Sequence, residues 1–209
     1  MTRYLVVVVL LVSCGDDDGN PGMDASVRAD SGGGGGRRDA GGGGGGRDAG
    51  GGGGGELDCN DFDSWPAAWA AEEERALEEM NRNRGAGTAC VSGPQATSGA
   101  FTMDRELRIA ARCHSMDMAQ NNFFSHTGSG DTNFVERANT AGYSGGPRAE
   151  NIAAGNATGV PTVGQWMGSE TGHCEAIMNE GYNEVGIGYM QLSGTRWTHY
   201  WTAVFGARR

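Results

Sequence analysis

A long glycine-rich segment near the start of the chain limits how much of it can fold. Between residues 15 and 56, almost every position is Gly, Asp, Arg, Ser or Ala, and none is aromatic. Such a composition cannot bury enough apolar surface to offset the entropy lost on ordering, so we predict a disordered Gly-rich linker over residues 15–56. Residues 57–209 hold all five Trp residues and are long enough for one well-buried domain.

The first fourteen residues have the pattern of a signal peptide. Arg3 gives a positively charged start, residues 5–12 are apolar, and small residues precede Cys14. The apolar run is much shorter than the roughly 20 residues that a membrane-spanning helix needs. We therefore predict that residues 1–14 direct export and do not form a permanent transmembrane anchor.

The end of this signal resembles the lipobox of bacterial lipoproteins. Leu-Val-Ser-Cys occupies residues 11–14, and in a lipobox the cysteine is acylated and becomes the mature N-terminus. The resemblance implies that acylated Cys14 holds the chain to a lipid bilayer of the cell envelope. Gly15, where an inner-membrane retention signal has aspartate, favours the outer membrane, facing the periplasm or the exterior. The alternative is an ordinary signal peptide cleaved nearby, with Cys14 incidental.

The distribution of charge bears on the class of partner. The formal net charge is −10, and the basic residues are all Arg, spread along the chain without a cluster. A surface that tracks phosphates needs such a cluster, so we exclude nucleic acid as a partner.

The cysteines that follow Cys14 predict disulfides. Four remain in the folding part: Cys59, Cys90, Cys113 and Cys174. An even number in an exported chain indicates two disulfides, because that compartment permits them. Three pairings are possible, and their spacing alone does not choose among them.

Apolar periodicity predicts four helices. The first runs from Pro66 to Gly85, with its apolar face opposite the glutamates at positions 72–74, 78 and 79. The second begins near Thr102 or Asp104, ends at residues 121–122, and has an inner face that is apolar throughout. Shorter helices are expected over residues 131–141 and 160–169.

Alternating residues late in the chain predict two strands. Val185, Ile187 and Tyr189 alternate with glycines, and residues 200–205 alternate in the same way. We expect a hairpin that turns at residues 193–194. Helices that come first and strands that come last favour an α+β domain with an antiparallel sheet.

Five short strings in order carry a family resemblance. They are Phe-Phe-Ser-His-Thr-Gly at 123–128, Ala-Glu-Asn-Ile-Ala at 149–153, Trp-Met at 166–167 leading to Gly-His at 172–173, Glu-Val-Gly-Ile-Gly-Tyr at 184–189, and Tyr-Trp-Thr at 200–202. Together they are similar to the CAP superfamily, or SCP domain, of the cysteine-rich secretory, antigen 5 and pathogenesis-related 1 proteins. The resemblance covers about residues 71–206. It implies a three-layer α-β-α sandwich with a small antiparallel sheet, here a CAP/SCP domain over residues 57–209.

The resemblance also implies a ligand-binding cleft centred on two histidines. His126 and His173 match the histidines that face the cleft, and Glu150 matches a glutamate beside them. Glu170 matches less closely, because it lies four residues after Trp166 where relatives place an acid three residues after, and a solvated surface charge is the alternative. Two neutral imidazoles with carboxylates nearby can hold Zn²⁺. His114, by contrast, falls on the apolar face of the second predicted helix and is expected in the core.

Bacterial sequences that resemble this one also imply a disulfide pairing. In them, a cysteine after the first helix accompanies a Gly-His-Cys motif. The resemblance therefore implies Cys90 with Cys174, and with it Cys59 with Cys113.

Three functions remain open from the sequence. The first is a tethered extracytoplasmic module that binds an unknown ligand or a metal through the cleft. The second is a metal-dependent hydrolase of envelope or extracellular substrates, in which a metal lowers the pKa of a bound water and Glu150 is the candidate general base. The third is a structural envelope protein. Because there is no His-Glu-x-x-His helix, no motif identifies catalysis.

The anchor can be tested by Cys14→Ser. We expect this variant to leave the membrane fraction, because the acyl chains of a lipoprotein contribute about 0.8 kcal/mol per buried CH₂. Ser13→Ala, which keeps the cysteine, is the control and should stay with the membrane. Membrane retention of Cys14→Ser in fractionation would contradict lipid anchoring.

Overall fold

The computed structural model describes residues 57–208, which form helices around one sheet. The sheet has four strands in the order β1-β3-β4-β2. The elements in chain order are α1 (Ala67–Ala86), β1 (Thr102–Met103), α2 (Arg105–Gln120), α3 (Phe134–Thr140), β2 (Gly146–Ala154), α4 (Gly159–Met167), α5 (His173–Met178), β3 (Glu184–Gln191) and β4 (His199–Ala207).

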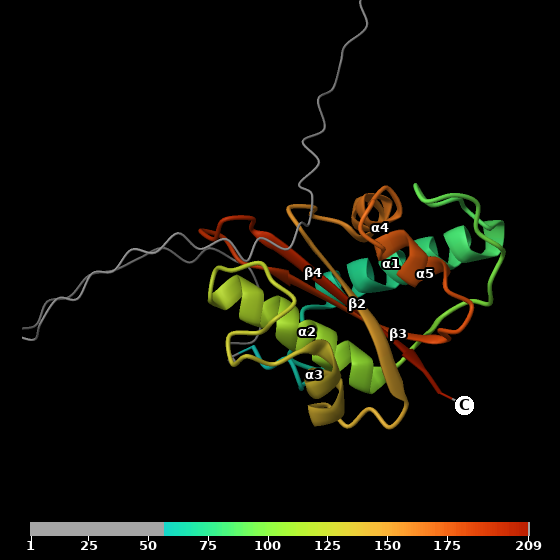
Figure 1. Ribbon diagram of the computed structural model, residues 1–209. Helices are drawn as coiled ribbons and strands as arrows, with labels where there is room; N and C mark the ends of the chain where they lie inside the picture. The colour runs from blue at the N-terminus through green and yellow to red at the C-terminus, as the bar shows by residue number, and fades with distance from the viewer. Residues whose placement is uncertain (1–56, 209) are drawn as a thin grey trace, which may run out of the picture. The chain divides into compact units, whose positions relative to one another are not determined.

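The helices cover both faces of the sheet and so make three layers (Figure 1). Helices α2 and α3 lie on one face, and α1, α4 and α5 lie on the other. Residues of β3 and β4 alternate between two cores. Val185 and Ile187 pack with α1, α4 and α5, whereas Val204 packs with α2 and α3. The predicted three-layer α-β-α fold is confirmed.

The sheet is larger than the predicted hairpin and is not wholly antiparallel. β3 and β4 pair as expected, with Gln191 opposite His199, but their connection spans residues 192–198 and is longer than the tight turn that was predicted. β2 pairs antiparallel with β4 from Gly146 to Ala154. β1 adds a short parallel pairing with β3 at the far edge.

Two glycines of β3 let α2 lie close against the sheet. A methyl group at Gly186 would collide with the backbone of Leu107, and one at Gly188 would collide with the backbone of Ala111. The alternation of glycine in this strand therefore serves packing. It fixes the distance of α2 from the sheet, because no larger residue fits between them.

A buried ion cluster joins α1, α2 and β3, contrary to the sequence expectation. Glu73 was assigned to the polar face of its helix, yet it is fully buried. Its carboxylate accepts hydrogen bonds from Arg108 Nε (2.8 Å) and Arg112 Nη2 (2.6 Å). It also accepts from the Trp65 indole (3.0 Å) and the Tyr189 backbone N–H (3.1 Å). The inner face of α2 is therefore not apolar throughout, because two of its turns carry arginines that neutralise Glu73.

Arg84 fixes the segment that follows α5. Its guanidinium is buried and donates to four backbone carbonyls: those of Gly99, Ile177, Asn179 and Tyr182. The C-terminal end of α5 is thereby attached to the last turn of α1. A cation is well placed there, because the carbonyls at the ends of helices carry partial negative charge.

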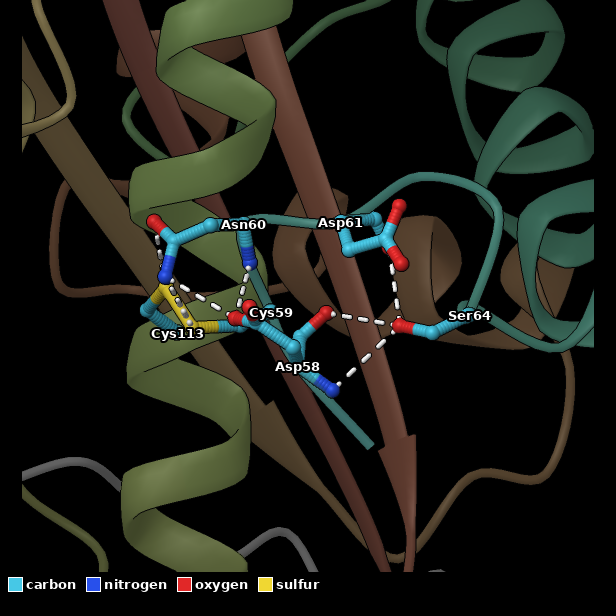
Figure 2. Close-up of a disulfide and its surroundings, with 6 residues drawn as sticks. All are labelled: Asp58, Cys59, Asn60, Asp61, Ser64 and Cys113. Carbon is cyan, nitrogen blue, oxygen red and sulfur yellow. Dashed lines mark hydrogen bonds between the residues drawn. A yellow bond between two sulfur atoms is a disulfide. The ribbon is translucent and has the colours of Figure 1, made fainter. Parts of the chain in front are cut away.

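Two disulfides attach irregular segments to helices. Cys90–Cys174 holds the loop after α1 to the start of α5. Cys59–Cys113 holds the segment before α1 to α2, and Figure 2 shows this bond beside Asn60. In the same segment, Ser64 Oγ lies within hydrogen-bonding distance of the carbonyls of Asp58 (3.1 Å) and Asp61 (3.0 Å). Both cysteine pairs are those implied by the resemblance.

The predicted helices differ from the observed ones mainly at their ends. α1 continues through Gly85 to Ala86, and Gly87 ends it in the left-handed conformation (φ 63°). α2 begins after Asp104, whose side chain accepts the Leu107 N–H as an N-cap. β2 and α5 were not predicted. β2 has no polar alternation because most of its second half is buried on both faces, and α5 has only six residues.

The signal peptide, Cys14 and the linker lie outside the described residues. Within residues 57–208, no helix is both long and apolar enough to span a membrane.

The ion cluster predicts that replacing either of two adjacent glutamates changes the free energy of unfolding by very different amounts. Glu73→Gln leaves Arg108 and Arg112 without their buried counter-charge, and we expect a loss of about 3–5 kcal/mol in the free energy of unfolding. Glu74→Gln is the control, because Glu74 pairs with Arg108 from a half-exposed position and should cost less than about 1 kcal/mol. Chemical denaturation measures both variants. If the two variants lost the same small amount of free energy of unfolding, the buried cluster would not stabilise the fold.

Candidate functional site

Glu150 and His126 form the centre of the site. Glu150 lies in β2, its side chain is almost fully buried, and its Oε1 lies 3.0 Å from His126 Nδ1. His126 is in the loop after α2, and 46% of its side chain is exposed. An ionised carboxylate only accepts hydrogen bonds, so His126 donates through Nδ1. When the imidazole is neutral, its lone pair is therefore on Nε2.

Arg137 holds both Glu150 and the loop that carries His126. One nitrogen of its guanidinium donates to Glu150 Oε2 (2.6 Å) and to the His126 carbonyl (3.0 Å). The other terminal nitrogen donates to the Thr132 carbonyl (2.5 Å). The helix that presents Arg137, α3, is itself fixed by a capping box between Asn133 and Glu136. His126 is thus held through its ring by the carboxylate and through its main chain by the arginine.

The environment of Glu150 keeps it ionised. Burial alone would raise its pKa, but the hydrogen bond from His126, the charges of His114 and Arg137, and the Arg137 hydrogen bond together lower it. Both carboxylate oxygens are also engaged, one by each partner. An ion-paired carboxylate with a lowered pKa is a poor general base, so the geometry suits Glu150 to orienting His126.

His173 begins α5 and is held by hydroxyl groups. Its Nδ1 lies 2.9 Å from Ser169 Oγ and 3.4 Å from Thr171 Oγ1. Gly172, at φ +88°, makes the turn that folds His173 back toward Ser169, a conformation that other residues rarely adopt. The His173 carbonyl accepts from Asn151 Nδ2 (3.0 Å), which ties the start of α5 to the β2 residue after Glu150.

The structure attaches the two predicted histidines to neighbouring residues of β2, His126 through the Glu150 side chain and His173 through the Asn151 side chain. Burial lowers the pKa of His173, and the charge of His126 lowers it further. His114 lies in the core, where it is fully buried, as expected. Its Nε2 donates to the Ser125 carbonyl (2.9 Å), one residue before His126.

Glu170 is not joined to this group. It is exposed in the loop between α4 and α5, and within residues 57–208 no hydrogen bond or ion pair involves it. Its neighbour Ser169 makes the contact with His173 instead. Arg137 and Ser169 were not among the predicted site residues. Ser and Thr shortly before Gly-His are a weak local signal for Ser169, and no sequence pattern identifies Arg137.

The donor set fits a transition metal only in part. Each imidazole has Nδ1 occupied, by Glu150 in one case and Ser169 in the other, which is the arrangement that leaves Nε2 for a metal. Across the described part of the chain, no group of three His, Cys, Asp or Glu side chains is placed to hold a metal ion. Water or a ligand would have to complete a tetrahedral shell around the two imidazoles.

Comparison with known proteins establishes the class. The family model "CAP: Cysteine-rich secretory protein family" matches residues 77–205. The chain belongs to this family.

Two curated relatives agree with this assignment. The uncharacterized protein YkwD of Bacillus subtilis is 30% identical over 135 residues, which are 65% of this chain and 48% of that protein. The uncharacterized membrane protein YlbC of the same organism is 34% identical over 99 residues, 45% of this chain and 28% of that protein. The chain therefore spans half or less of the curated relatives that it matches.

Solved structures share the fold. An extracellular protein containing an SCP domain from Bacillus anthracis matches with a TM-score of 0.57 and 22% identity, over 71% of this chain and 44% of that chain. An outer surface protein from Borrelia burgdorferi matches with a TM-score of 0.54 and 18% identity, over 66% of this chain and 94% of that chain. At these identities the likeness shows the fold alone.

The buried His114 predicts loss of stability in acid. Burial lowers its pKa below the ordinary histidine value, so the unfolded chain takes up a proton first as the pH falls below about 6.5. Its contribution to stability is therefore present above that pH and is lost below it, by at most about 1.4 kcal/mol per pH unit. Denaturation from pH 7 to pH 5 should show a shallower fall in His114→Gln than in the unsubstituted chain. Parallel curves would exclude His114 as a cause.

Proposed function

We propose that this chain is a tethered extracytoplasmic binding module of the CAP superfamily, in which His126 and His173 together hold a ligand or a divalent transition metal such as Zn²⁺. One observation carries the proposal: each ring is held through Nδ1, by Glu150 or by Ser169. Among the described residues, neither Nε2 has a hydrogen-bond partner. Imidazoles held in this way are prearranged to bind a ligand through Nε2.

The export signal and the likeness to extracellular and surface proteins support a location outside the cytoplasm. Two disulfides agree with an oxidising compartment. Acylated Cys14 would attach the domain to the envelope, and the linker would let it reach ligands away from the bilayer surface.

The carboxylate of Glu150, with both oxygens already hydrogen-bonded, favours binding over hydrolysis as the function. A metal-dependent hydrolase needs a carboxylate that can take a proton from bound water. Glu150 instead shares its charge with Arg137 and His126 through both oxygens. A bound metal would act here as a Lewis acid that contacts a ligand, and the chain's own residues would orient the two imidazoles.

Zinc titration tests the proposal. Calorimetry on the Cys14→Ser chain should detect binding, and replacing either His126 or His173 with Ala should remove most of the heat, because each supplies one of two protein ligands. His199→Ala is the control, because His199 is hydrogen-bonded to Tyr189 in another part of the sheet and should leave binding unchanged. Unaltered titration of the His126→Ala, His173→Ala double variant would reject the site.

A further inference from the structure

We infer that Ser169, and not the neighbouring Glu170 that the resemblance placed in the cleft, is the positioning residue for His173. The inference rests on the proposed function and adds a residue to its site. Ser169 Oγ is 2.9 Å from His173 Nδ1, well within hydrogen-bonding distance, whereas Glu170 is exposed and contacts no described partner through a hydrogen bond or ion pair.

Ser169 is itself fixed to the core. Its backbone N–H donates to the Trp166 carbonyl (3.2 Å) at the end of α4. Trp166 is almost fully buried, and its indole donates to the Ile152 carbonyl (3.0 Å) in β2. Because β2 also carries Glu150, the hydroxyl that holds His173 and the carboxylate that holds His126 are positioned by the same strand.

The other contacts of the Ser169 hydroxyl accommodate the tautomer that we infer for His173. Ser169 Oγ accepts the Thr171 backbone N–H (3.2 Å) and lies 2.9 Å from Thr171 Oγ1. If Ser169 gives its proton to Thr171 Oγ1, both of its lone pairs are filled, one by the Thr171 N–H and one by His173 Nδ1–H. His173 then has its lone pair on Nε2. The opposite arrangement would put the ring proton on Nε2 and remove the ligand atom.

Ser169 and Glu170 are adjacent, so they make a matched pair of variants. Ser169→Ala removes the acceptor for Nδ1–H, and Ser169→Thr restores a hydroxyl. Glu170→Gln changes the neighbouring charge and leaves the Ser169 contact intact. Each is made in the Cys14→Ser chain.

Two readouts separate this inference from the proposed function. The first is long-range ¹H–¹⁵N correlation NMR of the metal-free chain, which reports the tautomer of His173. We expect Nδ1–H in the parent chain, in Ser169→Thr and in Glu170→Gln, and a loss of that tautomer in Ser169→Ala. The second is zinc affinity, which should fall about 10- to 100-fold in Ser169→Ala and stay unchanged in Glu170→Gln.

Each outcome supports or overturns the inference. An Nε2–H tautomer in the parent chain, or unchanged His173 signals in Ser169→Ala, would overturn it while leaving zinc binding to be judged on its own. A Glu170→Gln variant that loses zinc affinity as Ser169→Ala does would return the role to the carboxylate. If the parent chain takes up no zinc, the proposed metal fails, and the NMR comparison still decides whether Ser169 positions His173.

Discussion

The buried carboxylate of Glu73 is the interaction on which the arrangement of layers depends. It lies between the two sides of the sandwich: α1 supplies the acid, α2 supplies Arg108 and Arg112, and β3 supplies the Tyr189 N–H. Such a group costs several kcal/mol to desolvate, and only the complete set of donors offsets that cost. The set is complete only when α1, α2 and β3 have their native relation. The cluster therefore favours one arrangement of the helices over other apolar packings of similar area.

The site forms at the opposite edge of the sheet, where β2 is the outer strand. An edge strand has hydrogen-bonding groups that no neighbouring strand satisfies, and here two helices and a loop supply the partners. Asn151 and the Ile152 carbonyl hold α5 and α4, while the Glu150 side chain holds the loop of His126. The rigid layers thus position β2, and β2 positions both histidines. Residues from four separate stretches of chain converge at a strand that the core holds in register through β4.

Sequence reasoning predicted the parts of this fold that repeat regularly and missed those that depend on contacts. Periodicity located α1, α2 and the β3–β4 pair. It misplaced Glu73, because a buried charge has the same sequence pattern as a solvated one until its partners are known. The motifs identified His126, Glu150 and His173 but not Arg137. Arg137 contributes because its helix folds back, so that the guanidinium reaches the carbonyl of His126, eleven residues earlier in the chain. Glu170 and Ser169 are adjacent in sequence, and only the folded structure shows that Ser169 is the one that meets His173.

The two imidazoles of the site are not equivalent, and the difference indicates how a ligand would engage them. His126 is backed by an anion and has nearly half of its side chain exposed, whereas His173 is backed by a hydroxyl and is only 8% exposed. A carboxylate behind an imidazole raises its basicity as a ligand more than a neutral hydroxyl does. A ligand arriving from solvent therefore meets His126, the more accessible donor, first. His173 is the less accessible of the two, so a ligand held by both would contact His126 over more of its surface than His173.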